Sequence, residues 1–524
     1  MSGELLQVLP ADARIVIEIG DNPGETLKTD YGRMNPQCRY LQIPPDSDLT
    51  TDAIAAEIGN VDVLVYNCTP FDRVRFAQLL PHLTQWLKPG GQAIALLPNS
   101  QYWRLQPGEA KPGLTLPEIR SHFNQAGFYI YEVRTRGDRD PEFQYFLERI
   151  RPQLLSSGID IKPYSAQILS PQYLIRAIKS TEPPRRLLIQ TAIMAPTGCD
   201  RIRVLNPDRF SVTIPGTRVF STVKSARIIT TLPQEEKVFI WQRTIMSYRE
   251  HLPILRHLLQ EGYLIVAEID DNPLRRREYA DNRYLSYRGC HAVQTSTKPL
   301  GVFLRQFNPN VAVFGNHLAE LPPPRNDPET PEVTLFFGAL NREKDWQPII
   351  QSINKILRKY RTNIRAKVIH DRRFFEALEM TQKTFEPFCP YDRYLEILRT
   401  CDIALLPLTP DPVNLMKSDL KFIESAGNGV AVLASPTVYH HSIIPEKTGL
   451  IYRTIQQFET HLDRLISDQE FRQTIAANAY NWVRDNRLLC QHYQQRRDWY
   501  LQLRDRLPEL NRELQQRVPE LFRN

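Results

Sequence analysis

The sequence lacks the cysteine spacing of a metal site or a disulfide framework. Its seven cysteines form no C-x-x-C pair and follow no regular ligand spacing. No run of eighteen apolar residues occurs, and the amino-terminal segment has no basic region followed by a signal-like apolar run. These absences predict a protein of the reducing cytoplasm that holds no metal, is not secreted and does not span a membrane.

An excess of one charge is also missing. The net charge is only +7 over 524 residues, and lysine and arginine form no long run. This balance does not predict nucleic-acid binding and is typical of a solvated surface, although it also suits anionic partners such as nucleoside diphosphates. Peripheral contact with the inner face of the cell membrane stays open, because a local basic and aromatic patch would suffice. With 42% hydrophobic and 24% charged residues, the composition is that of a globular enzyme.

Short apolar runs alternate with helix-like stretches along most of the chain, which predicts an α/β fold of three Rossmann-like units. Five prolines between residues 322 and 331 predict a stiff link between the last two units, which suggests an enzyme with a two-lobed cleft. The pattern predicts a first α/β domain, a helical connector, two further α/β lobes and a helical tail, at 1–139, 140–183, 184–325, 332–484 and 485–524.

Two local patterns refine this organisation. Alternation over 209–215 predicts a strand in the second unit. Beyond about residue 455 the pattern is helical, and four apolar residues form one stripe: Phe458, Leu462, Leu465 and Ile466.

The segment NLMKSDLKFIESAGNGVAVLAS, residues 414–435, carries the clearest functional pattern. A helix beginning near Lys417 would place Lys417, Lys421 and Glu424 on one face. Ser418 and the free N–H groups of the first turn would then bind phosphate, and Glu424 would accept hydrogen bonds from vicinal hydroxyls such as those of a ribose. An amphipathic helix with ordinary surface ion pairs is the alternative, but the glycines and buried strand that follow favour a nucleotide site.

This segment resembles the C-terminal lobe of retaining GT-B glycosyltransferases of the large group-1 class, which is family 4-like. Five residues match the N-x-x-KSD-x-K-x-x-E motif: Asn414, Lys417, Ser418, Lys421 and Glu424. Met416 stands where the first of two glutamates usually falls. The resemblance implies a nucleotide-diphosphate sugar as donor substrate, retention of configuration and no required metal or cofactor. It implies catalytic roles for Lys417, Glu424 and Lys344.

A second element, FFGALNREKDW at residues 336–346, resembles the turn that brings basic residues to the diphosphate in that class. The donor-binding residues expected there are Gly338, Asn341 and Arg342, with Lys344 stabilising the departing diphosphate. A solvated basic turn is the alternative. Phe388 and Tyr391 lie in a stretch that resembles the nucleobase site, and either ring could instead belong to the core.

The segment YLIVAEIDDNP resembles the acceptor side of such enzymes, so Asp270 and Asp271 are candidate acceptor contacts. An acidic pair at a strand end is as often only a turn former or helix cap. Asn316 resembles the point where the first lobe reaches the cleft. His251 and His317 could approach an acceptor or sugar, although lone histidines are usually structural.

The front domain resembles class I methyltransferases that use S-adenosylmethionine, through RIVIEIGDNPGETLKTDYGRMNPQCRYLQIP, LTQWLKPGGQAIALLPNSQYW and GFYIYEVRTR. The usual G-x-G turn is replaced after Gly20 by residues 21–24, and acidic positions hold Pro44-Pro45 and Cys68-Thr69. These changes remove groups that would bind the cofactor. We therefore expect a degenerate scaffold that does not bind S-adenosylmethionine.

The sequence as a whole predicts a hexosyltransferase-like glycosyltransferase of glycan biosynthesis. Its acceptor would be a glycan, a lipid-linked molecule or a protein. Two alternatives stay open: a non-catalytic scaffold that binds nucleotide sugars, and a bifunctional methyltransferase and glycosyltransferase.

Overall fold

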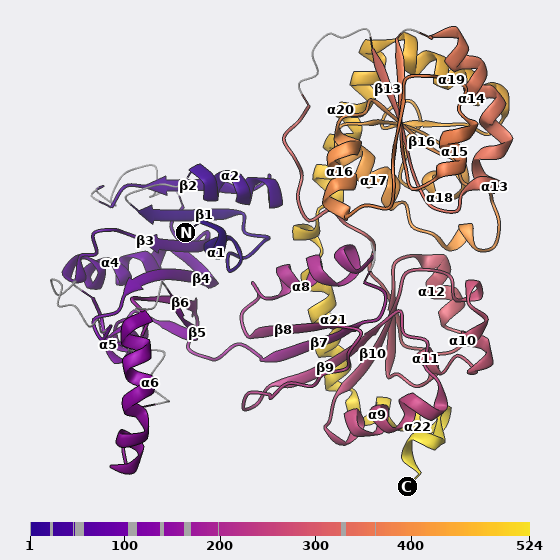
Figure 1. Ribbon diagram of the computed structural model, residues 1–524. Helices are drawn as coiled ribbons and strands as arrows, with labels where there is room; N and C mark the ends of the chain where they lie inside the picture. Colours follow the sequence, from indigo (N-terminus) through magenta and orange to yellow (C-terminus); the bar gives the residue numbers. More distant parts are fainter. Residues whose placement is uncertain are drawn as a thin grey trace. The chain divides into compact units, whose positions relative to one another are not determined.

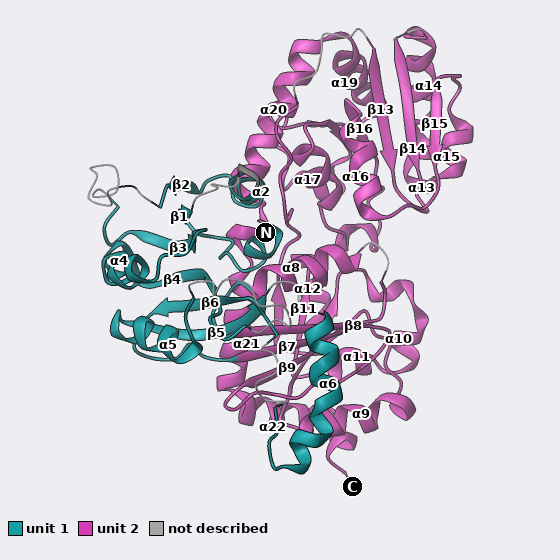
Figure 2. Cartoon of the chain, turned by 60° about the vertical axis from the view of Figure 1, so that its left-hand side comes forward, with its two compact units in different colours: residues 1–186, 213–216 teal, residues 187–212, 217–524 magenta. Residues whose placement is uncertain are grey.

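The computed structural model describes residues 2–20, 25–45, 47, 57–102, 113–136, 141–161, 169–196, 199–325, 332–361 and 363–523. It forms two compact units, coloured separately in Figure 2: Met1–Arg186 with Thr213–Gly216, and Leu187–Val212 with Thr217–Asn524. The predicted α/β fold class is confirmed, because the chain builds three six-stranded sheets, one in the first unit and two in the second.

The first unit contains one mixed sheet of order β2-β1-β3-β4-β6-β5. Its parallel strands are β1 (Ile15–Gly20), β2 (Arg39–Ile43), β3 (Val61–Asn67) and β4 (Leu87–Pro98). Strand β6 (Gln172–Lys179) runs antiparallel between β4 and β5 (Phe128–Arg136). The helices are α1 (Ser2–Leu6), α2 (Glu25–Met34), α4 (Arg73–Trp86), α5 (Leu116–Gln125) and α6 (Pro141–Ser156).

The expectation of a helical connector over 140–183 is wrong in its second half. Helix α6 ends at Ser156, and β6 completes the first sheet with five consecutive buried residues, Tyr173–Ala177. A short apolar run does not reveal its partner strands, which lie at 87–98 and 128–136. The two compact units divide after Arg186, shortly beyond Glu182-Pro183-Pro184.

The second sheet forms the centre of what we call the N-lobe, residues 187–212 and 217–325. Its six strands are all parallel, in the order β12-β11-β10-β9-β7-β8. They are β7 (Leu187–Ile193), β8 (Thr217–Val223), β9 (Glu236–Gln242), β10 (Leu264–Ile269), β11 (Ala292–Thr295) and β12 (Val311–Val313). The helices are η1 (Arg201–Leu205, a π-helix), α8 (Asn206–Ser211), α9 (Tyr248–Gln260), η2 (Pro273–Arg275), α10 (Arg277–Asp281), α11 (Leu285–Arg288) and α12 (Lys298–Leu304).

The expectation of a strand at 209–215 is wrong. Helix α8 extends to Ser211, and β8 begins only at Thr217. The π-helical turn η1 runs directly into α8, and Pro207 occupies the first helical turn, where proline is well tolerated. Phe210 and Ile214 are buried and Val212 is only partly buried, so the alternation falls at a helix end and not in a strand.

The third sheet forms the centre of the C-lobe, residues 332–486. Its six parallel strands follow the order β15-β14-β13-β16-β17-β18. They are β13 (Val333–Gly338), β14 (Ile364–Ile369), β15 (Lys383–Glu386), β16 (Ile403–Leu406), β17 (Ala431–Ala434) and β18 (Leu450–Ile451). Helices α14 (Ile350–Lys359) and α15 (Arg372–Ala377) lie on one face, and α16 (Tyr391–Arg399) and α17 (Leu420–Gly427) on the other (Figure 1).

The remaining C-lobe elements are short turns and two longer helices. They are α13 (Glu343–Trp346), η3 (Gln347–Ile349), η4 (Asn414–Met416), α18 (Pro436–Tyr439), α19 (Ile455–Ser467) and α20 (Gln469–Asn486). The predicted apolar stripe lies on α19, and all four of its residues are buried. Residues 326–331 of the proline-rich link lie outside the described part of the chain.

The carboxyl-terminal helices return to the N-lobe. They are η5 (Leu489–Gln491), α21 (Gln494–Asp505), α22 (Leu507–Arg517) and η6 (Pro519–Phe522). Tyr500, Leu503 and Leu510 pack with the N-lobe strands in one core cluster. The predicted tail is therefore part of the N-lobe core. Among the described residues, no helix has the length and apolar content needed to cross a membrane.

Candidate functional site

The loop of residues 412–419 precedes helix α17 and carries most of the basic motif. The turn η4 ends at Met416, and Lys417 is extended, with φ −71° and ψ 159°. Helix α17 begins at Leu420, with Asp419 at its N-cap position. The prediction of a helix from Lys417 is thus wrong, and Lys417 and Ser418 lie in the loop before it.

Asp419 accounts for this geometry. Its carboxylate accepts hydrogen bonds from Arg487 at 2.6 and 2.8 Å and another from Ser442. Burial alone would raise the pKa of Asp419, but the hydrogen bonds and charge of Arg487 lower it. The anchor holds the last loop residue in place, and its partner lies 68 positions along the chain, beyond the reach of local pattern analysis.

Lys421 and Glu424 share one face of α17, as predicted. The Lys421 ammonium lies 3.3 Å from the Glu424 carboxylate and 4.0 Å above the centre of the Tyr394 ring. Glu424 is only 1% exposed. Burial and the Glu424 carboxylate raise the pKa of Tyr391 and Tyr394 well above the ordinary tyrosine value.

A column of aromatic rings leads away from this pair. Phe388 stacks on His370 with ring centres 5.0 Å apart, and His370 stacks on Tyr394 at 6.5 Å. Phe388 is 58% exposed, so one candidate nucleobase neighbour presents open ring surface. Sequence analysis missed His370, which directly follows β14 in a left-handed conformation, with φ 73°. Burial and the charge of Lys421 lower the pKa of His370 to about 4, which keeps the ring neutral near pH 7.

Asn414 has a supporting position. Its amide nitrogen donates to Asp345 at 3.1 Å and to the Thr409 carbonyl at 3.0 Å, and its amide oxygen accepts from Arg342 at 3.1 Å. Both amide hydrogens are therefore engaged within the chain. Asn414 connects the 412–419 loop to the turn after β13, and its amide is not free to bind a nucleotide-sugar substrate.

Asp345, also missed from the sequence, is the centre of this connection. Its carboxylate accepts from the Thr409 N–H at 2.8 Å and from Arg342 at 3.1 Å, in addition to Asn414. The side chain is 4% exposed. In the sequence it looked like one acid in an exposed basic turn, and only the fold reveals its burial.

The other residues of this turn differ in exposure. Asn341 is exposed and has φ 54°, and Lys344 is exposed on α13. Gly338 ends β13, where a Cβ would come within 2.5 Å of the Phe336 ring and 2.7 Å of the Tyr394 ring. The need for glycine at 338 therefore arises from the packing of these two rings.

The acidic pair after β10 is held by cations. Arg243 donates to Asp270 at 2.5 Å, and Asp271 pairs with Arg275 at 2.9 Å and with Lys417 at 3.6 Å. Burial alone would raise the pKa of Asp271, but these positive neighbours, Lys417 foremost, lower it. Asp271 thus joins the N-lobe to the loop that carries the basic motif.

Lys417 lies in an unusual electrostatic environment. Burial lowers its pKa, and the negative charge of Asp271 offsets only part of this effect. The positive charge of Arg342 lowers the pKa further. Arg342 also donates to Asn414 at 3.1 Å, which joins the turn after β13 to the loop that carries Lys417. Such a cluster favours an anion, because a bound negative group relieves the repulsion.

Asn316 connects the lobes, whereas the two histidines take part in local packing. The Asn316 amide nitrogen donates to the Ser418 hydroxyl oxygen at 2.8 Å. His251 accepts the Ser247 N–H at 3.2 Å beside helix α9. His317 stacks on His492 at 4.0 Å, and burial lowers its pKa well below the usual range. Among the described residues, no group of three or more histidine, cysteine or acidic side chains is placed to hold a metal ion.

Comparison with known families bears on the C-lobe. Residues 346–501 match the family model described as glycosyl transferase-like. This part of the chain is therefore similar to glycosyltransferases. The match includes Lys417, Lys421 and Glu424 and ends within α21. The search of curated proteins finds no match.

Solved structures provide further likenesses. Sucrose-phosphate synthase from Thermosynechococcus elongatus has 13% identity and a TM-score of 0.45, and the match covers 61% of this chain and 99% of that one. HepE from Anabaena, solved with UDP and glucose, has 14% identity and a TM-score of 0.43, with coverage of 60% and 99%. A glycosyltransferase from Rickettsia africae has 11% identity and a TM-score of 0.43, with coverage of 60% and 98%.

In the first unit, strand β1 carries two residues that bear on cofactor binding. Gly20 ends β1, where a Cβ would lie 2.6 Å from the Asn67 carbonyl oxygen. The buried Glu18 accepts hydrogen bonds from Tyr40 at 3.0 Å and Gln42 at 3.2 Å. Residues 21–24, which replace the expected G-x-G turn, lie outside the described part of the chain.

Proposed function

We propose that this protein transfers a sugar from a nucleoside diphosphate sugar to a hydroxyl of a glycan or glycoconjugate, with retention of configuration and without a metal. The observation that supports this most is the contact between the two basic motifs: Arg342 donates to Asn414 at 3.1 Å, three residues before Lys417 in the same loop. The charge of Arg342 also lowers the pKa of Lys417. Two cations beside a loop whose Ser418 hydroxyl is already oriented suit a diphosphate.

The donor would be bound in two parts. The diphosphate would meet Arg342, Lys417 and Ser418, with Lys344 available from the exposed face of α13. The nucleobase would stack on the exposed Phe388 ring, which His370 supports from behind. Stacking on an aromatic ring tolerates any base, so this arrangement does not choose among nucleotides.

The chemical step would separate charge that these cations stabilise. The bond from the anomeric carbon to the diphosphate oxygen breaks, and the acceptor oxygen forms its bond on the same face of the sugar. The acceptor proton passes to the departing phosphate oxygen. Fixed positive groups stabilise the negative charge that develops on that phosphate. Asp271 is a weak base because its pKa is lowered, which fits a step in which the leaving group takes the proton.

Transfer is tested by incubating the full chain with nucleotide sugars and candidate acceptors and detecting the glycosylated product by mass spectrometry. The anomeric configuration of the product, read from proton NMR couplings, distinguishes retention from inversion. Chelator should leave the rate unchanged. Product of inverted configuration, or a rate that requires a divalent ion, would contradict the corresponding part of the proposal.

One observation favours the scaffold alternative. Met416, where a glutamate would fall, packs against the N-lobe core cluster that includes Leu300 and Leu304. This position therefore offers no carboxylate to the sugar. Donor binding without transfer to any acceptor or to water would support a scaffold.

For the first unit we propose a degenerate methyltransferase-like domain. The GFYIYEVRTR segment, which carries part of the resemblance, forms β5 and pairs antiparallel with β6. The carboxylate of Glu18 is already bonded to Tyr40 and Gln42. Titration of the full chain with S-adenosylmethionine should give no saturable heat. Binding in the micromolar range would overturn this proposal.

A further inference from the structure

Three polar residues of the N-lobe, each shortly after the end of a strand, contact the 412–419 loop. These residues follow β10, β11 and β12, whose carboxyl ends lie at the same edge of the parallel sheet. The contacts are Asn272 to the Pro412 carbonyl at 3.3 Å, Thr297 to the Met416 carbonyl at 2.9 Å, and Asn316 to the Ser418 hydroxyl at 2.8 Å. The N-lobe therefore holds the loop along its length.

The contact at Asn316 differs from the others because a buried cation supports it. Arg203 donates to the Asn316 amide oxygen at 2.9 Å and to the Phe314 carbonyl at 2.6 Å. It also pairs with Glu268 at 2.7 Å. The amide of Asn316 is thus fixed in orientation: its oxygen faces Arg203 and its nitrogen faces Ser418.

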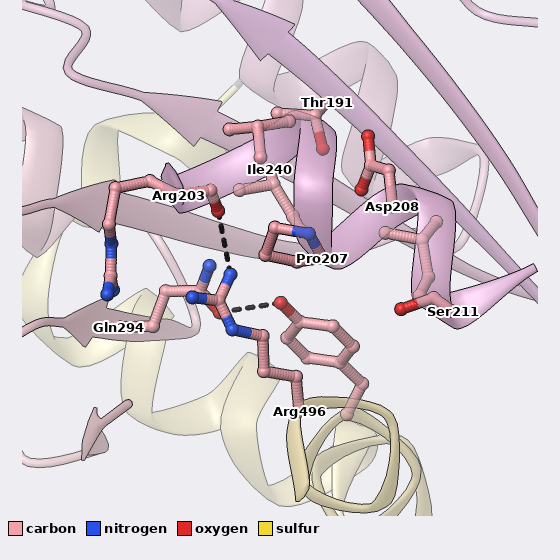
Figure 3. A pocket seen from close by; sticks show the side chains of 11 residues that line it. Thr191, Arg203, Pro207, Asp208, Ser211, Ile240, Gln294 and Arg496 are labelled. Atoms are coloured by element: carbon pink, nitrogen blue, oxygen red, sulfur yellow. Dashed lines mark hydrogen bonds between the residues drawn. The ribbon is translucent and has the colours of Figure 1, made fainter. Parts of the chain in front are cut away.

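The backbone of Arg203 is held in turn by the carboxyl-terminal helices. Arg496 on α21 donates to the Arg203 carbonyl at 2.8 Å. Figure 3 shows this bond at a small cavity, with the Arg203 guanidinium extending away from it. The cavity, lined also by Thr191, Asp208 and Gln294, has room for about one water molecule. Arg203 is therefore fixed at both its main chain and its side chain.

The free-energy cost of burying the Arg203–Glu268 ion pair indicates that Arg203 serves to position another group. The side chains of Arg203 and Glu268 are 1% and 0% exposed. Within the described residues, Nη2 of Arg203 and Oε2 of Glu268 have no hydrogen-bond partner. A buried ion pair with unpaired atoms contributes little to stability, and apolar side chains of similar volume often do better. Its benefit is then the exact placement of the group it holds, which is Asn316.

We propose that Asn316, supported by Arg203, is a positioning residue of the donor site. Asn316 donates to the Ser418 oxygen, so the Ser418 proton points elsewhere and is available to an anion. Asn316 also draws the loop that carries Lys417 toward the N-lobe. The role of Ser418 toward a diphosphate rests on the proposed function, whereas the positioning of the loop does not.

Hydrogen exchange tests the loop positioning without any ligand. In Asn316→Ala, amides of the loop such as Met416 and Lys417 should exchange about 2- to 12-fold faster, the fold-change that corresponds to one hydrogen bond. Asn308→Ala is the matched control, because its buried amide donates only to the Tyr287 and Cys290 carbonyls. Unchanged exchange in the loop of Asn316→Ala, or an equal rise in Asn308→Ala, overturns the proposal.

Asn316→Asp provides a second test that keeps the size of the side chain. The carboxylate can still accept from Arg203, but its contact with Ser418 persists only with the Ser418 hydroxyl donating to it. Loop exchange in this variant should stay near the original rate, while binding of UDP, GDP and ADP weakens because the Ser418 proton is no longer available to an anion. Loop exchange as fast as in Asn316→Ala, or unchanged nucleotide affinity, would contradict the role given to Asn316.

A double-mutant cycle tests the effect on the donor site. Titration with UDP, GDP and ADP should show binding about 2- to 12-fold weaker in Asn316→Ala and in Ser418→Ala. The double variant should bind no more weakly than the weaker single variant, because both changes break the same bond. If the losses of nucleotide affinity in the two single variants multiply in the double variant, Asn316 does not act through Ser418. Failure of the unchanged protein to bind any of the three would instead refute the proposed function, while hydrogen exchange still decides the positioning.

Discussion

Asp345→Asn tests whether one buried carboxylate organises the two basic motifs. The substitution keeps an oxygen for the Thr409 N–H, which now lies 2.8 Å from Oδ1. It turns the Arg342 ion pair, at 3.1 Å, into a contact between two donors or a weak neutral bond. The bond from Asn414 of the 412–419 loop to this side chain, 3.1 Å long, would then have a neutral instead of a charged acceptor and become weaker.

The magnitude follows from the exposure of the pair. A hydrogen bond to a charged group contributes about 1.5–3 kcal/mol. The Arg342 side chain is 22% exposed and the Asp345 side chain 4%, so solvent screens part of this energy. We expect a loss of about 1–2 kcal/mol after that screening. For a unit of this size the melting temperature should fall by about 2–8 °C.

Nucleotide affinity provides the second readout. With Arg342 released, titration with UDP, GDP and ADP should show binding about tenfold weaker, equivalent to about 1.4 kcal/mol. Glu343→Gln is the control, because Glu343 lies on α13 with Asp345 but pairs with the exposed Arg373 of α15. That variant should melt and bind like the unchanged protein. An Asp345→Asn protein with unchanged melting temperature and nucleotide affinity would refute the role of Asp345.

Two further predictions concern the base and the phosphate. Phe388→Ala should weaken nucleotide binding by about 1–3 kcal/mol, as loss of base stacking does, while Phe388→Tyr should keep the original affinity. The melting temperature of both variants should stay unchanged because the ring is 58% exposed. Nucleotide affinity in Phe388→Ala equal to that of the unchanged protein would remove this ring from the site. Because the pKa of Lys417 is lowered, nucleotide binding should weaken as the pH rises, at a lower pH than that at which an ordinary lysine loses its proton. Lys417→Arg should abolish this decline. Identical alkaline binding profiles for the two proteins, measured by calorimetry, would contradict this role.

The periodic elements were accessible from the sequence because they depend on local patterns. The α19 stripe from Phe458 to Ile466 is buried as its 3.6-residue spacing predicted. The pairing of Lys421 with Glu424 also follows from helix geometry alone. By contrast, the start of α17 depends on Asp419, whose partner Arg487 is remote in sequence. Strand β6 was missed because its partners lie at distant positions.

The supporting residues of the site were the hardest to predict. Asp345 and His370 look like ordinary polar residues near strand ends, and only the folded chain buries one and stacks the other. Arg203 resembles a surface charge in the sequence, yet it is 1% exposed. These side chains act through partners far along the chain, so no local pattern identifies them.

Donor titration of Lys417→Ala tests the central claim most directly. The full chain, the variant and a control, Lys355→Ala, whose exposed lysine pairs with Glu459, are titrated with a panel of nucleotide sugars. At least one sugar should bind the unchanged protein and the control alike, and its binding to Lys417→Ala should be abolished. Equal affinity of Lys417→Ala and the unchanged protein, or no binding of any nucleotide sugar, would contradict the assignment of this loop as a donor site.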